Sequence, residues 1–284
     1  MNLEEPVIRR MIDEAMAEDL GCGDITSTAV IPEEALFTGT MAAREEMVVA
    51  GLEIACEVFR RLAPEVVIET FVRDGERVPA GTVLARISGP ARGLLSAERT
   101  ALNVLQHLSG IATLTRAYVD QLQGTRATLL DTRKTIPGLR AAAKYATRMG
   151  GAANHRMGLH DAVLIKDNHI AVCGGVAQAV ARARSAGLSP VEVEVDTLDQ
   201  VAEAVAARAE RILLDNMDAP TLRRAVEIVA GRAETEASGG VHLENIRAIA
   251  EAGVDFISVG RITQSAPAVD VGLDWIARSY THEP

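Results

Sequence analysis

The stretch VEVEVDTLDQVAEAVAARAERILLD, residues 191–215, contains a complete strand–helix–strand unit. Its first residues alternate valine with an acidic side chain, as a β-strand does, and a helical pattern follows. A second short apolar strand, RILL, then ends in Asp215. A strand, a helix and a further strand in this order indicate neighbouring parallel strands.

The same rhythm continues over the C-terminal half of the chain. The other predicted strands are ATLLD (127–131), AVLIK (162–166), TEASGG (235–240) and FISVGR (256–261). A complete eight-stranded barrel needs about 250 residues and only about 150 remain here, so we predict an incomplete α/β barrel of six or seven parallel strands. Its active site should lie at the carboxyl ends of the strands.

The N-terminal part has a different pattern. A helix is predicted at 4–19, where Pro6 suits the first turn. Short strand-like stretches with turn signals fill residues 38–90, interrupted by one helix near 52–62. Ser96 then opens a long helix with an apolar stripe.

Two domains are expected from this change of pattern. The Ser109–Gly110 pair predicts the boundary, so the first domain should cover 1–110 and the barrel 111–269. The tail, 270–284, is expected to pack back on the first domain.

Bulk composition limits the function classes. The net charge of −10 argues against binding to nucleic acid or an anionic membrane. No apolar run approaches the roughly 20 residues of a membrane span, and the charged N-terminus is unlike a signal peptide, so a cytoplasmic protein is predicted. Cys22, Cys56 and Cys173 are too widely spaced to predict a disulfide framework or a cysteine zinc site.

One segment reverses the acidic average. Between Arg126 and Lys166 eight Lys and Arg residues stand against two Asp residues. A basic segment inside an acidic protein indicates a small, highly charged anionic ligand.

Three motifs of this segment predict anion binding. The segment DTRKTIPG (131–138) comes directly after a predicted strand. It contains two adjacent cations and two hydroxyls, which suit the binding of a carboxylate or phosphate. GGAANHRMGL (150–159) combines small residues with further donors, and Lys166 stands where an apolar strand stops. Solvated turns that pair with surface acids are the structural alternative.

Carboxylates and glycines follow the later strands. Glu194 and Asp215 suit Mg²⁺ or ribose hydroxyls, although ion pairs with the basic segment would use the same positions. Alternation places Glu192, Glu194 and Asp196 on one face of their strand without singling out one of them. A phosphate cradle of backbone N–H groups is predicted at Ser238, Gly239, Gly240 and at Val259, Gly260, Arg261.

Several catalytic classes lack their motifs. The sequence contains no GxSxG elbow, no GxxxxGK[ST] loop, no HExxH and no GxGxxG after an opening strand. Hydrolase, P-loop, zincin and Rossmann interpretations therefore lose their main support.

Seven segments together resemble the quinolinate phosphoribosyltransferase family, also called decarboxylating nicotinate-nucleotide pyrophosphorylase. They are EDLGCGDITS (18–27), SAERTALN (96–103), DTRKTIPGLR (131–140), NHRMGLHD (154–161), LIKDNHI (164–170), LLDN (213–216) and SGG (238–240). The resemblance implies an N-terminal α/β sandwich, an incomplete barrel, and a glycosyltransferase of de novo NAD biosynthesis. Its products would be nicotinate mononucleotide, carbon dioxide and pyrophosphate.

The resemblance also implies an assignment of site residues. Quinolinate would contact Thr132, Arg133, His155, Arg156 and Lys166, together with Arg99 from the second subunit of a homodimer. Phosphoribosyl pyrophosphate would contact Lys134, Glu194, Asp215, Ser238, Gly239, Gly240, Val259, Gly260 and Arg261. Mg²⁺ would be held by Glu194 and Asp215, directly or through water, and Lys134, Lys166, Glu194 and Asp215 would be catalytic. The sequence does not distinguish dimers from hexamers.

Two positions depart from the family pattern, and three other functions remain open. Ala152 stands where a third glycine is common, and Gln264 stands where a histidine is common. The alternatives are a paralogous phosphoribosyltransferase acting on another ring, a Schiff-base aldolase using Lys134 or Lys166, and a non-catalytic sugar-phosphate-binding barrel.

Overall fold

The computed structural model describes residue 3 and residues 5–276, which form two compact units. The first unit combines the chain up to residue 114 with segment 137–150 and with the chain from residue 266 onward. The second unit combines 115–136 with 151–265. The predicted tail beyond residue 276 lies outside the described residues. Within the described part of the chain, no helix has both the length and the apolar character needed to cross a membrane.

The first unit is built on an antiparallel sheet in the order β12-β1-β5-β3. The strands are β1 (Leu36–Ala43), β3 (Val67–Thr70), β5 (Val83–Pro90) and β12 (Val271–Trp275), and a separate pair is formed by β2 (Met47–Val48) and β4 (Arg77–Val78). Burial alternates along β1. Such alternation is expected of a sheet that covers a core with one face only.

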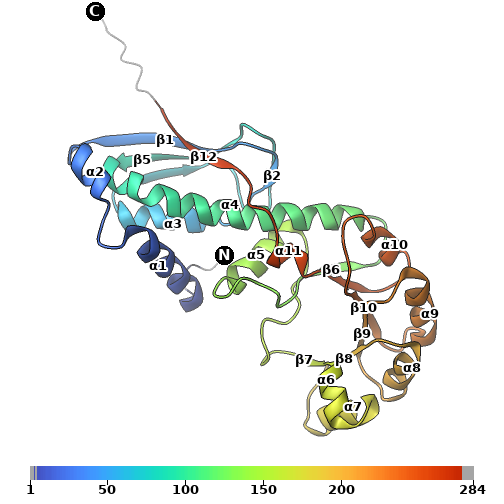
Figure 1. The fold of residues 1–284 in the computed structure, drawn as a ribbon. Coiled ribbons are helices and arrows are strands. Elements are labelled where there is room, and N and C mark those ends of the chain that lie inside the picture. The colour runs from blue at the N-terminus through green and yellow to red at the C-terminus, as the bar shows by residue number, and fades with distance from the viewer. Residues whose placement is uncertain (1–2, 4, 277–284) are drawn as a thin grey trace, which may run out of the picture. The chain divides into compact units, whose positions relative to one another are not determined.

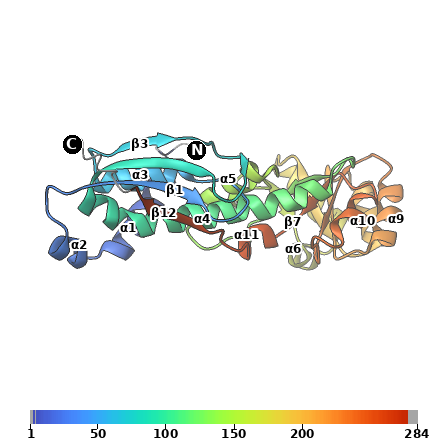
Figure 2. The ribbon, with the colours of Figure 1, turned by 90° about the horizontal axis from the view of Figure 1, so that it is seen from above.

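Helices complete the first unit. They are α1 (Pro6–Leu20), α2 (Ile25–Val30), α3 (Leu52–Leu62), α5 (Arg140–Gly150) and the part of α4 (Ala91–Gln121) up to residue 114. Figures 1 and 2 show α3 and α4 along one face of the sheet. Phe59, Leu84, Ile87 and Leu105 are fully buried between these layers. The predicted α/β sandwich is confirmed.

The expected boundary at residue 110 stays a prediction, and two structural features bear on how the chain is grouped. Helix α4 is continuous across residue 110. Gly110 lies where the helix packs closely on another segment, since a Cβ there would overlap the backbone carbonyl of Pro267. Segment 137–150, expected in the barrel, groups with the first unit because Ala142, Ala143 and Ala146 join its apolar core.

The second unit is an open parallel sheet in the order β6-β11-β10-β9-β8-β7. Its strands are β6 (Thr128–Leu130), β7 (Val163–Ile165), β8 (Val191–Val195), β9 (Arg211–Asp215), β10 (Glu234–Ser238) and β11 (Phe256–Ser258). All five strand pairs are parallel, and Ala153 forms an isolated parallel bridge with Leu130 beside β6. The predicted incomplete parallel barrel is confirmed, with six strands.

The helices of the second unit begin soon after the strands end. They are α6 (Asp167–Cys173), α7 (Val176–Ser185), α8 (Leu198–Ala206), α9 (Ala219–Val229), α10 (Ile246–Ala250) and α11 (Arg261–Gln264). Thr197 caps α8 by accepting a hydrogen bond from the Gln200 N–H, and Asp218 caps α9 by accepting one from the Thr221 N–H. Figure 1 shows α7 to α10 on the outer side of the strands.

Register places polar side chains on one face of this sheet. Glu194 pairs with Leu213, Leu213 with Glu236, and Asp215 with Ser238. Since side chains two residues apart share a face, Glu192 lies on the same face as Glu194. The inner face therefore carries acidic residues both at the strand ends and deeper in the barrel.

Candidate functional site

A pocket of 430 Å³ opens at the carboxyl ends of the strands of the second unit. The predicted residues that line it are Thr132, Arg133, Lys134, His155, Arg156, Lys166, Glu194, Asp215, Ser238, Gly239 and Gly240. Each of them follows or ends a strand, except for His155 and Arg156, which follow the Ala153 bridge. The open sheet thus brings together side chains that are far apart in the sequence.

A smaller hollow of 240 Å³ adjoins this pocket and forms the predicted cradle. It shares Lys134 and the 238–240 turn with the larger pocket and adds Val259, Gly260 and Arg261. Gly239 has a φ of +85°, and a Cβ there would overlap the side chain of Asn216. Only glycine therefore fits at the centre of the turn.

Asp131 ties two parts of the pocket together. Its buried carboxylate accepts hydrogen bonds from the His155 backbone N–H at 2.9 Å and from the Asn154 side chain at 2.5 Å. The Thr263 hydroxyl donates to the Lys134 carbonyl at 2.7 Å and holds the turn that follows β6. Asp131 is a positioning residue that the sequence did not single out.

Arg156 is partly buried beside a second cation. Burial and the charge of Arg133 lower the pKa of Arg156. Its guanidinium donates to the Ala162 carbonyl at 3.2 Å, and Asp161 fixes the following turn by accepting from the Met157 and Gly158 N–H groups. Two fixed cations in one pocket favour an anionic ligand with more than one charge.

Lys166 and two acidic residues also line the pocket. The Lys166 ammonium pairs with Glu194. Burial and the charges of Glu194 and Asp196 raise the pKa of Asp215. Glu194 and Asp215 therefore form a site that would gain from a bound cation.

Glu192 and Glu236 were missed as pocket residues. Glu236 lines the pocket although it is fully buried, and Glu192 lies beside it. With His155 they form, among the residues the structure describes, the one group of three metal-capable side chains whose ligand atoms lie within 4.8 Å of one another. The alternation in VEVEVD indicated that Glu192 shares a strand face with Glu194. Glu236 lies in TEASGG (235–240), a stretch that the sequence analysis used only for its serine and glycines.

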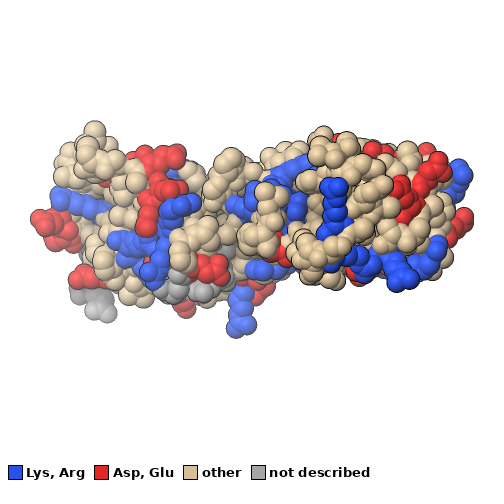
Figure 3. All heavy atoms as spheres, turned by 90° about the horizontal axis from the view of Figure 1, so that it is seen from below, with Lys and Arg blue, Asp and Glu red and all other residues tan. Residues whose placement is uncertain are grey.

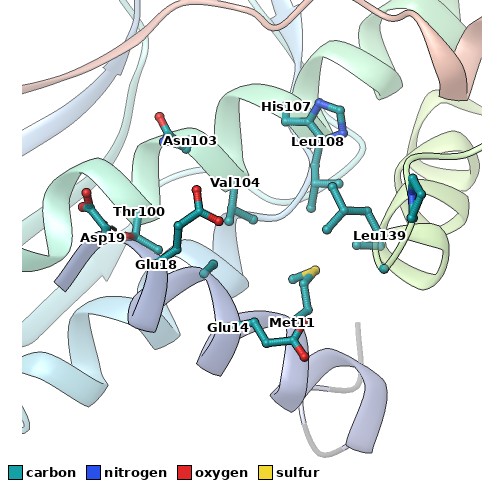
Figure 4. Close-up of a pocket in the computed structure, with 14 residues that line it drawn as sticks. Met11, Glu14, Glu18, Asp19, Thr100, Asn103, Val104, His107, Leu108 and Leu139 are labelled. Carbon is teal, nitrogen blue, oxygen red and sulfur yellow. Dashed lines mark hydrogen bonds between the residues drawn. The ribbon is translucent and has the colours of Figure 1, made fainter. Parts of the chain in front are cut away.

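A different pocket, of 350 Å³, lies in the first unit between α1, α4 and residues 137–142. Figure 4 shows Glu14, Glu18 and Asp19 from α1 opposite Thr100, Asn103 and His107 from α4. Burial lowers the pKa of His107. This pocket carries carboxylates where the barrel pocket carries cations, so its charge does not suit an anionic substrate.

Arg99 lies in neither of the barrel hollows. It is an exposed residue of α4 within the first unit. On the molecular face shown in Figure 3, Lys and Arg side chains are interspersed with Asp and Glu side chains. The cations of the barrel pocket are therefore a local feature of a surface with mixed charge.

Both units match one family. Residues 24–109 match the model described as "Quinolinate phosphoribosyl transferase, N-terminal domain" and residues 111–274 match "Quinolinate phosphoribosyl transferase, C-terminal domain". The chain belongs to the quinolinate phosphoribosyltransferase family. It is thus a phosphoribosyltransferase, as the sequence resemblance implied.

Known members of the family are similar over nearly the whole chain. Carboxylating nicotinate-nucleotide pyrophosphorylase of Mycobacterium leprae is 46% identical over 275 residues, which are 94% of this chain and 96% of that protein. The probable enzyme of that name from Bacillus subtilis is 41% identical over 269 residues, with 94% and 93% covered. The structure of the Francisella tularensis nicotinate-nucleotide pyrophosphorylase superposes with a TM-score of 0.92 at 43% identity, covering 95% of this chain and 96% of that one.

Proposed function

We propose that this quinolinate phosphoribosyltransferase transfers the phosphoribosyl group of phosphoribosyl pyrophosphate to quinolinate, with release of carbon dioxide and pyrophosphate. One observation carries the proposal: a cation-lined pocket and a glycine-rich cradle adjoin at the carboxyl ends of one parallel sheet. This arrangement suits a dicarboxylate next to a sugar phosphate. The words carboxylating and decarboxylating in the names of relatives describe the two directions of this reaction.

The dicarboxylate is assigned to the side of the pocket with Arg133, Arg156 and Lys166. A guanidinium offers two parallel N–H groups to a carboxylate, and an ammonium offers a compact point charge. The Thr132 hydroxyl and His155 complete this side. Several fixed cations favour a ring with two carboxylates over a ring with one, which supports quinolinate over nicotinate.

The phosphoribosyl donor is assigned to the cradle. Backbone N–H groups at Ser238–Gly240 and Val259–Arg261 suit its 5-phosphate, and Lys134 lies between cradle and pocket. Glu194 and Asp215 suit the ribose hydroxyls.

Magnesium fits the same carboxylates. Glu194 and Asp215 are oxygen ligands of the kind Mg²⁺ prefers. Burial, and after it the charges of Glu194 and Asp196, raise the pKa of Asp215, and a bound cation would offset both effects. We propose that Glu194 and Asp215 hold Mg²⁺ directly or through water. When bound with the donor, the ion would neutralise charge on the departing pyrophosphate.

The residues of the chain account for the remaining chemistry. Breaking the bond between C1 of ribose and pyrophosphate leaves positive charge on the ribose, which Glu194 and Asp215 stabilise. The ring nitrogen then donates its electron pair to C1 and becomes a pyridinium. The bond from C2 to its carboxylate breaks, carbon dioxide leaves, and the electron pair left on C2 takes up a proton to give nicotinate mononucleotide.

A homodimer is part of the proposal. Arg99 is exposed and lies outside the barrel hollows of its own chain, so it is free to serve the pocket of a second copy. A cytoplasmic location is also part of the proposal.

Turnover with defined substrates tests the proposed function. Purified protein is incubated with quinolinate, phosphoribosyl pyrophosphate and Mg²⁺, and nicotinate mononucleotide and carbon dioxide are quantified. We expect equal amounts of both products, loss of turnover with a chelator, and recovery when Mg²⁺ is added back. Arg156→Ala should abolish turnover, whereas Arg224→Ala, which removes an exposed arginine of α9, should leave it intact.

The same assay separates the alternatives. Turnover of nicotinate in place of quinolinate would indicate a sister activity, and binding of the donor without turnover would indicate a non-catalytic barrel. Covalent trapping of a carbonyl substrate by borohydride would indicate Schiff-base chemistry at Lys134 or Lys166.

A further inference from the structure

Three side chains form a buried cluster at the floor of the barrel pocket. His155 Nε2 lies 3.3 Å from Glu192 Oε2 and 3.6 Å from Glu236 Oε2. The side chains are 11%, 8% and 0% exposed, respectively. Glu236 lines the pocket from below, so its charge acts on whatever anion the pocket holds.

Within the part of the chain that the structure describes, three of the four carboxylate oxygens of the cluster lack a hydrogen-bond donor. Among the described residues, no donor forms a hydrogen bond with either oxygen of Glu236 or with Glu192 Oε1. The groups facing Glu236 are Glu192, His155, the Ser258 hydroxyl, and Arg211, whose guanidinium lies 3.8 Å away. Buried ionised carboxylates without donors are costly, so the cluster requires either an additional proton or a bound cation.

The hydrogen bonding of the His155 ring shows whether the cluster is suited to an additional proton or to a metal ion. The Arg156 backbone N–H donates to His155 Nδ1 at 2.7 Å, so Nδ1 is an acceptor and the ring proton lies on Nε2. Nε2 then has no lone pair for a metal, and it donates toward the carboxylates. A ring with one proton is neutral, so it leaves the negative charge of the carboxylates in place.

We propose that Glu236 carries a proton and acts as a positioning residue, which makes the floor of the dicarboxylate pocket uncharged and holds His155 in its Nε2–H form. This inference rests on the proposed function, because an uncharged floor matters most beneath a ligand with two negative charges. Burial and the charge of Glu192 raise the pKa of Glu236. A protonated Glu236 also supplies a donor to the cluster.

Substitutions at Glu236 test the proposal through the pH profile. In the unmodified enzyme, kcat/KM for quinolinate should fall by up to about tenfold per pH unit once the pH rises past the raised pKa of Glu236. Glu236→Leu should lower kcat/KM at every pH by about tenfold or more, because it removes the partner of the His155 ring. Glu236→Gln should restore the kcat/KM that is lost in Glu236→Leu. It should also abolish the fall of kcat/KM at high pH, which is the alkaline limb of the profile.

A matched control and an independent readout keep the test decisive. Glu227→Gln changes an exposed glutamate of α9 and should leave the profile as it was. Infrared absorption of a protonated carboxyl should be visible in the unmodified protein at neutral pH, should disappear along the alkaline limb, and should be missing in Glu236→Gln. This readout needs no turnover, so failure of the proposed function would be seen separately.

Three results would overturn the inference. The first is an alkaline limb that persists in Glu236→Gln, and the second is an infrared spectrum without a protonated carboxyl. The third is stoichiometric binding of Zn²⁺ or Mn²⁺ that is lost in Glu236→Gln, which would show a metal centre in place of a proton.

Discussion

Burial and, after it, the positive charge of Arg133 lower the pKa of Arg156, because the two cations share one pocket. A dianion placed between them would replace this repulsion with two attractive contacts. Geometry then matters as much as charge, because a planar guanidinium can bind a carboxylate through two N–H groups.

Arg156→Lys is therefore expected to weaken quinolinate binding although the charge is kept. The loss of paired hydrogen bonds to a charged group corresponds to about 1.5–3 kcal/mol, so KM for quinolinate should rise roughly tenfold or more. KM for phosphoribosyl pyrophosphate should change by less than about twofold. Steady-state kinetics with each substrate varied in turn would check this, and an equal rise in both values would contradict it.

Asp131→Ala is expected to destabilise the fold. The substitution leaves the His155 N–H and the Asn154 amide without their acceptor, and each buried unpaired donor costs about 1–3 kcal/mol. Urea unfolding should show a loss of at least about 2 kcal/mol. Asp199→Asn, at an exposed position of α8, serves as the control and should stay within about 0.5 kcal/mol.

The contrast between Glu194 and Glu236 shows how far single residues could be predicted. Glu194 stands near the end of its strand, where a barrel exposes its catalytic side chains, and the family resemblance distinguished it from Glu192 and Asp196. Glu236 lies in mid-strand, and its depth depends on the register of β10 with β9. Sequence spacing gives the face of a strand but not its height in the barrel, so Glu236 could not be placed.

Among the elements, the turn after β10 combines a strained backbone with a close contact. Gly239 has a positive φ and lies against Asn216. Gly231 also has a positive φ, of +71°, but a Cβ there would meet no atom within 4 Å. At both positions a residue with a side chain would strain the backbone, because φ is positive. Only at position 239 would its Cβ also overlap a neighbouring side chain.

Gly239→Ala should therefore disturb the cradle much more than Gly231→Ala. We expect the affinity for phosphoribosyl pyrophosphate to fall at least about tenfold in the first variant, because one misplaced backbone donor costs about 1–3 kcal/mol. Isothermal titration calorimetry with the donor would measure this. Equal affinity in both variants would show that the turn does not bind the donor.

Elements were easier to predict than the borders between units. Each strand of the barrel has a short apolar run followed by a polar residue. The length of these runs and their regular spacing along the sequence allow the strands to be recognised. Gly110 was taken for a boundary because a helical glycine beside a serine resembles a break. Gly110 also lies against the backbone of Pro267, more than 150 residues away, and such a contact leaves no local signal in the sequence.

At the scale of the whole molecule, the proposed homodimer predicts complementation. Arg99→Ala and Lys166→Ala should each be inactive alone. If Arg99 serves the partner's pocket, half of the dimers in an equal mixture are mixed, and each has one intact site, so about a quarter of the original activity should return. Mixing after mild dissociation and assaying turnover would check this, and no recovery by verified mixed dimers would place Arg99 outside the site.

The stability of the protein should also depend on Glu236. Because its pKa is raised in the folded state, the folded protein holds a proton that the unfolded chain releases at lower pH. This stabilising contribution is complete below the unfolded pKa of about 4.3 and declines, by up to about 1.4 kcal/mol per pH unit, until the raised pKa is passed. Urea unfolding from pH 4 to pH 9 should show this decline relative to Glu236→Gln, and parallel curves would contradict it.

The cradle around Gly239 has a consequence for inhibitor resistance. A compound that draws its affinity from a side chain without a role in the reaction, such as His242 in the lining of the cradle, can be escaped by changing one codon, since the side chain is the contact. A compound whose anionic group rests on the main-chain N–H groups of residues 238–240 offers no such side chain to replace. The remaining route, a larger residue at position 239, collides with Asn216 and would harm the enzyme before it excluded the drug.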